Sequence, residues 1–116
     1  MSGAVSNLDL AFAALADPTR RRIVARLTRG ELRVTDLAQP FAMSLNAVSK
    51  HLKVLEGAGL VRRRREGREH YLRLRAAPLR EVARWTSQYE RFWSQRLDAL
   101  GAFLDQQQEN DDEGSQ

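Results

Sequence analysis

The stretch SLNAVSKHLKVLEGAGLVRRRREGREHYLRLR, residues 44–75, combines two periodicities. In its first half, aliphatic residues recur every three or four positions, which predicts a helix over residues 44–58. In its second half the period changes towards two on both sides of the turn EGRE, which predicts a β-hairpin over residues 60–75. A helix followed at once by a hairpin is therefore the first element of the fold that the sequence defines.

The predicted helix has two chemically different sides. Val48, Leu52 and Leu55 fall within a narrow arc and are expected to be buried. The opposite side carries short polar and basic residues: Asn46, Ser49, Lys50 and Lys53. Asn can pair with adenine, Ser can contact several base edges, and Lys can reach guanine or phosphate in the major groove of DNA. The alternative is an ordinary surface helix, and Val54 fits neither side.

The predicted hairpin is strongly basic, because residues 59–75 hold seven arginines in seventeen positions. The alternation of a strand divides the run of residues 62–65 between two faces, so about half of it can lie along a phosphate backbone. Arg68 lies at the turn, where its side chain could enter a minor groove. Leu72 and Leu74 are expected to point inward. The alternative is a solvated hairpin with no ligand.

Further helices precede and follow this stretch. Apolar spacing predicts a helix over residues 8–16, a second that begins at Asp17-Pro18 and ends before Gly30, and a short third near Val34. A fifth helix is predicted over residues 78–104. The fold class is therefore mostly α with a small β-hairpin, in the order of four helices, two strands and a long last helix. The short third helix, a turn and the fourth helix form a helix-turn-helix, and the hairpin is its wing.

Composition narrows the class of function. The 116 residues contain no cysteine, which excludes disulfides and thiolate metal sites. Five of the fifteen acidic residues lie in residues 105–116, so residues 1–104 form a markedly basic domain suited to nucleic acid. The acidic, Gln-rich segment 105–116 is expected to be disordered. Neither a signal peptide nor a membrane span is recognisable, and the expected location is the cytoplasm.

Several of these motifs together resemble the ArsR/SmtB family of bacterial winged-helix repressors. The resemblance covers roughly residues 8–75, and its more specific parts are ADPTRRRIV, SLNAVSKHLKVLEGAGLV and the glycine-containing wing. It implies a symmetric dimer on a palindromic operator of double-stranded DNA. Carried over by position, the residues expected to contact bases are Asn46, Ser49 and Lys50. Those expected to contact phosphate or minor groove are Ser44, Lys53, Arg64 and Arg68.

The sequence departs from the metal-responsive members of that family. One of their metal sites is written E-L-C-V-C-D-L, whereas this chain has ELRVTDL over residues 31–37, with Arg33 and Thr35 in place of both thiolates. A guanidinium cannot ligate a soft metal. The family's other common site needs a histidine on the last helix, and residues 78–104 contain none. No metal or other cofactor is expected, and His51 is expected to have a structural or phosphate-contacting role.

The predicted last helix carries more apolar surface than a domain of this size can cover. This surplus predicts a homodimer interface shared with the first helix, made by Leu8, Phe12, Tyr89, Trp93, Leu97 and Leu100. The alternative is a pocket for an unknown organic effector lined by the same aromatic helix.

The sequence therefore favours a dimeric, sequence-specific transcriptional repressor. The alternative is an architectural winged-helix protein that binds nucleic acid without much sequence choice, recognisable by affinity that depends mainly on salt. An enzyme is not expected, because no catalytic triad, phosphate loop or buried carboxylate pair is present.

Overall fold

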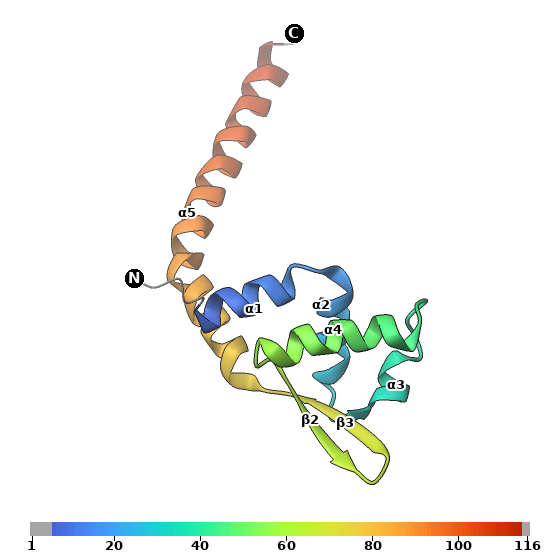
Figure 1. Cartoon of the computed structure of the whole chain (residues 1–116). Coiled ribbons are helices and arrows are strands. Elements are labelled where there is room, and N and C mark those ends of the chain that lie inside the picture. Colours follow the sequence, from blue (N-terminus) through green and yellow to red (C-terminus); the bar gives the residue numbers. More distant parts are fainter. Residues whose placement is uncertain (1–5, 115–116) are drawn as a thin grey trace. The chain divides into compact units, whose positions relative to one another are not determined.

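The computed structural model describes residues 6–114, and the side chains of residues 6–110. Four helices come first: α1 (Asn7–Leu15), α2 (Pro18–Leu27), the short α3 (Val34–Ala38) and α4 (Leu45–Gly57). The strands β2 (Val61–Glu66) and β3 (Glu69–Leu74) form the hairpin, and α5 (Ala76–Gly114) follows (Figure 1). The predicted mostly α fold with a helix-turn-helix and a small hairpin is confirmed.

The first two helices begin and end where the local sequence favours it. Ser6 and Asp17 are the N-caps of α1 and α2, and the Asp17 carboxylate accepts a hydrogen bond from the Arg20 amide. Arg20 in turn donates from Nε to the Ala14 carbonyl at 2.6 Å, and Arg21 donates to Leu15 at 2.8 Å. Because the last carbonyls of a helix lack partners within it, these two arginines complete the end of α1. They have a structural role there.

A third strand, β1 (Leu32–Arg33), was not predicted. It pairs antiparallel with β3, with Leu32 opposite Leu72, and gives a three-stranded sheet in the order β1-β3-β2. Two residues are too few for a periodicity to be recognised, and the pairing depends on β3, which comes about forty residues later. The strand joins the connection after α2 to the hairpin.

One hydrophobic core holds the helices and the sheet together. Its largest fully buried side chains come from α2, α3, α4 and the hairpin region, and no charged or polar side chain among residues 6–110 is buried with them. They are Ile23, Leu37, Val48, Leu52, Leu55, Leu60 and Leu72. The inward orientation predicted for Leu72 is confirmed, and Leu74 packs against the same core while partly buried.

The chain divides into two compact units, residues up to Val82 and residues from Ala83 onwards, and α5 runs through both. The prediction that α5 ends near Leu104 and that a disordered tail follows is wrong for residues 105–114, which are helical. Gln and Glu are good helix formers, and no proline or glycine interrupts residues 102–113. The last two residues of that predicted tail lie outside the described residues. No helix in the described range is long and apolar enough to cross a membrane.

The core predicts a specific stability contrast on α4. Replacing Leu52 with Ala should lower the free energy of unfolding by about 2–5 kcal/mol, because it leaves a cavity at a fully buried position. Replacing Val54 with Ala, on the same helix but 44% exposed, should change it by no more than about 0.5 kcal/mol. Denaturant unfolding measures both. Equal losses would show that α4 does not pack as described.

Candidate nucleic-acid interface

The rotation of α4 about its axis is fixed by its buried side. Val48, Leu52 and Leu55 have no exposed surface, and the Ser44 hydroxyl accepts a hydrogen bond from the Ala47 amide at 3.1 Å, which caps the helix. The polar residues predicted to face outward therefore lie on the solvent side. Asn46, Lys50 and Lys53 are exposed, as is Ser44, and Ser49 is half-buried.

Apolar residues border this polar face and were not assigned from the sequence. Leu45 is 50% exposed and Val54 is 44% exposed. At 100° per residue the two lie on opposite edges of the exposed arc that contains Asn46 and Lys50. Aliphatic groups at such positions can contact the methyl group of thymine. The only sequence signal for them was the failure of Val54 to fit either side of the helix.

His51 lies at the boundary between α4 and the start of α2. Its Nδ1 is 3.4 Å from Arg20 Nη1 and 3.8 Å from an Asp17 carboxylate oxygen. The backbone hydrogen bond from Arg20 lowers the pKa of Asp17, and the charges of His51 and Arg20 add to this effect. These contacts agree with the structural role predicted for His51, which ties α4 to the N-terminus of α2.

The hairpin turns at Gly67, whose φ of 61° lies in the left-handed region that favours glycine. Arg65 donates from Nε to the Gly67 carbonyl at 3.0 Å. Arg62 and Arg68 are exposed, and no hydrogen bond or ion pair of their guanidinium groups is seen among the described residues. These two side chains are therefore available to a ligand of opposite charge.

The two arginines in the middle of β2 are already paired with carboxylates. Arg63 donates to Glu56 of α4, with Nε 2.7 Å from Oε1. Arg64 pairs with Glu31, with Nη2 2.7 Å from Oε1, and with Glu66, with Nη1 2.9 Å from Oε2. The hydrogen bonds that Arg64 donates to both carboxylates raise its pKa, and they lower the pKa of Glu31. The arginine run is divided between two faces of β2, as predicted, and each face holds one of these paired side chains.

A cavity of about 260 Å³ lies where α3, α4 and the hairpin meet. Its lining brings a residue predicted to contact bases, Ser49, together with a wing residue predicted to contact phosphate, Arg68. The other lining residues are Val34, Thr35, Leu45, Arg63, Glu69 and His70. The reading side of α4 and the tip of the wing thus border a single hollow. Asn46 and Lys50 do not line it.

The residues predicted for a dimer interface are exposed on α5 and half-buried on α1. On α5, Tyr89 is 42% exposed, Trp93 56%, Leu97 63% and Leu100 52%. They belong to an apolar stripe, defined by the exposed large side chains of this helix: Trp85, Tyr89, Phe92, Trp93, Leu97, Leu100, Phe103 and Leu104. In the other compact unit, Leu8 and Phe12 of α1 are half-buried.

Within the apolar stripe the aromatic rings pack against their neighbours. The rings of Trp85 and Tyr89 are 5.0 Å apart, and those of Phe92 and Trp93 are 5.5 Å apart. A shallow groove follows Trp85, Tyr89 and Trp93 along the helix.

The helices α3 and α4 and the basic hairpin define this protein as a winged helix-turn-helix DNA-binding protein. A family model described as a helix-turn-helix domain matches residues 15–64. The HTH-type transcriptional regulator Rv2034 of Mycobacterium tuberculosis is 41% identical over 97 residues, which cover 84% of this chain and 88% of that protein. The match extends beyond the helix-turn-helix to most of the chain.

Two further comparisons name the family. A transcriptional repressor SmtB homolog of Synechocystis sp. is 48% identical over 63 residues, which cover 54% of this chain and 48% of that protein. The solved structure of an ArsR-like transcriptional regulator from Rhodococcus sp. RHA1 is 34% identical, with a TM-score of 0.67, and the alignment covers 85% of this chain and 91% of that one. This chain belongs to the ArsR/SmtB family of transcriptional regulators.

Proposed function

We propose that this regulator is a dimeric, metal-independent repressor that binds a two-fold symmetric operator through α4 and the wing. The observation that carries the proposal is the outward polar side of α4 beside the unpaired arginines of the hairpin. Asn46, Ser49 and Lys50 contact base edges in the major groove. Ser44, Lys53 and Arg68 contact phosphate or the minor groove. By occupying its operator at the nucleoid, the dimer blocks transcription; the Synechocystis relative is named a transcriptional repressor.

The chemistry of the β1–α3 segment supports metal independence. Arg33, at a position where metal-responsive members have a thiolate, pairs with Asp36 at 3.0 Å and lies 3.9 Å from Glu69. The hydrogen bond and charge of Asp36 raise the pKa of Arg33. No cluster of three metal-ligating side chains occurs in the part of the chain that the structure describes. A guanidinium at this point cannot ligate a metal, so repression does not depend on a metal bound at this segment.

The apolar stripe of α5 supports the dimer. It extends from Trp85 to Leu104, and a helix of the length of α5 spans about 58 Å. An exposed apolar surface of this extent marks an interaction site. A second copy accounts for the whole stripe, whereas an organic effector in the groove at Trp85 and Trp93 would cover only one end of it. Two copies would place their two α4 helices about one DNA turn apart, which requires a two-fold symmetric operator.

The base-reading role of Asn46 predicts a loss restricted to the operator. Replacing Asn46 with Ala should weaken operator binding by about 1–3 kcal/mol and leave binding to random DNA nearly unchanged, since the amide is lost only where it pairs with a base. Fluorescence anisotropy with both duplexes measures this difference. Gln95→Ala, which removes an exposed amide from α5, is the matched control and should affect neither. Equal losses on both duplexes for Asn46→Ala would contradict base reading.

The dimer proposal predicts that one charge on the stripe separates the copies. Leu97→Asp places a carboxylate on a side chain that is 63% exposed in the single chain and buried in the proposed dimer. Sedimentation should show wild type as a dimer and the variant as a monomer. Gln95→Asp adds the same charge outside the stripe and should stay dimeric. An unchanged mass for Leu97→Asp would show that the stripe is not the interface.

A further inference from the structure

The side chain of Arg64 is held from three directions. Its Nε and Nη2 donate to the two carboxylate oxygens of Glu31, at 3.3 and 2.7 Å, and its Nη1 donates to Glu66 at 2.9 Å. Its guanidinium carbon lies 4.4 Å from the centroid of the Tyr71 ring. A two-pronged contact of this kind fixes the orientation of the guanidinium as well as its charge. Three of the five N–H donors of the guanidinium are thereby engaged by carboxylates.

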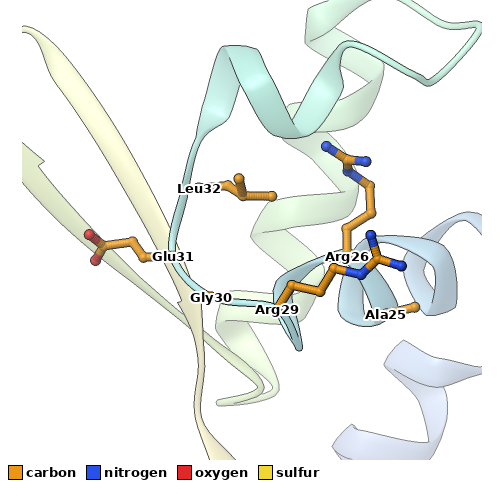
Figure 2. A pocket seen from close by; sticks show the side chains of 6 residues that line it. All are labelled: Ala25, Arg26, Arg29, Gly30, Glu31 and Leu32. Atoms are coloured by element: carbon orange, nitrogen blue, oxygen red, sulfur yellow. The ribbon is translucent and has the colours of Figure 1, made fainter.

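The partner Glu31 comes from a different part of the unit. It precedes β1 and follows Gly30, whose φ of 136° allows the chain to turn after α2. Figure 2 shows the Glu31 side chain directed towards the hairpin strands, away from the guanidinium groups of Arg26 and Arg29. The contact therefore joins two segments 33 residues apart in the sequence, the connection after α2 and the wing.

The neighbouring residue of β2 makes the opposite contact. Arg63 pairs with Glu56 of α4 at 2.7 Å, and adjacent side chains of a strand point to opposite faces. One face of the wing is thus attached to the reading helix and the other face to the connection before β1. Both contacts act on β2, which leads directly to the turn at Gly67 and to Arg68. Both contacts add to the strand pairing and the core in positioning the unpaired arginines of the wing relative to α4.

We infer that Arg64 is a positioning residue of the wing, and that its contact with Glu31 holds the wing at the angle at which Arg68 and α4 engage the same DNA. This inference rests on the proposed DNA-binding role of the wing. It assigns Arg64 a role different from the phosphate contact expected from the family resemblance. Glu31 acquires a function in DNA binding although it carries the same charge as DNA.

The direction in which one charge substitution changes DNA affinity tests this role. Glu31→Gln removes a negative charge from the basic face, so electrostatics alone, and the release of Arg64 towards phosphate, would tighten DNA binding. Loss of the positioning contact instead weakens it, and we expect roughly two- to fivefold lower affinity than wild type for a random duplex. Glu69→Gln removes the same charge from the wing beside the turn and gives up only a long contact with Arg33, at 3.9 Å, so it should tighten binding. Affinity of Glu31→Gln equal to or above wild type overturns the inference.

A second measurement needs no DNA, so that failure of the positioning role can be distinguished from failure of the DNA-binding proposal. In Glu31→Gln, amide hydrogen exchange of residues 61–74 should become faster, while that of the buried part of α4 should not change, because the wing alone loses its attachment. Unchanged exchange in the hairpin overturns the inference. This outcome does not depend on whether the wild-type protein prefers any DNA sequence.

The salt dependence of affinity separates positioning from phosphate contact. Arg68→Gln should reduce the slope of log affinity against log salt concentration by about one, because one phosphate contact is lost. Arg64→Gln should weaken binding and keep the wild-type slope. A slope that falls by the same amount in both variants would show that Arg64 contacts phosphate, and would overturn the inference.

Discussion

The orientation of α4 depends on the burial of Val48, Leu52 and Leu55, and the proposed function depends on that orientation. With these three side chains in the core beside Leu60 and Leu72, the helix cannot rotate without exposing aliphatic surface. Burial of this side leaves the opposite side of α4, with its polar and basic residues, exposed to solvent. The same burial places the start of β2 directly after α4, since the Leu60 amide bonds back to the Leu55 carbonyl at 3.0 Å. The core therefore aligns the reading helix and the wing together.

The distribution of carboxylates decides what the many arginines do. Arg20 and Arg21 complete the end of α1, and Arg63 and Arg64 are paired with glutamates. A count of basic residues describes the attraction to a polyanion but not which side chains remain available to contact it. In the hairpin, the arginines that are paired are those within reach of a glutamate, from α4, from the connection before β1 or from β2 itself. The wing combines positioning arginines with contacting ones in a single short run.

The elements that follow from local rules were predictable from the sequence, and those that depend on distant pairing were not. The cap at Ser44, the buried side of α4 and the turn at Gly67 each follow from a few adjacent residues. The strand β1 and the contact between Glu31 and Arg64 join segments more than thirty residues apart, and neither leaves a periodic signal. The continuation of α5 beyond Leu104 was missed because an acidic, Gln-rich composition is also typical of disorder. For the interface, the sequence predicted which face of α4 is exposed, but not the apolar border at Leu45 and Val54.

The most direct test of the account is a titration of the full-length protein against the DNA upstream of its own coding sequence and against a scrambled duplex of equal length. It should be run at two salt concentrations, with and without zinc. The account predicts tighter binding to the upstream DNA at both salt concentrations, by about a thousandfold or more, and no effect of zinc. Equal affinity for both duplexes would contradict sequence-specific repression and favour an architectural role, and release of the upstream DNA by zinc would contradict metal independence.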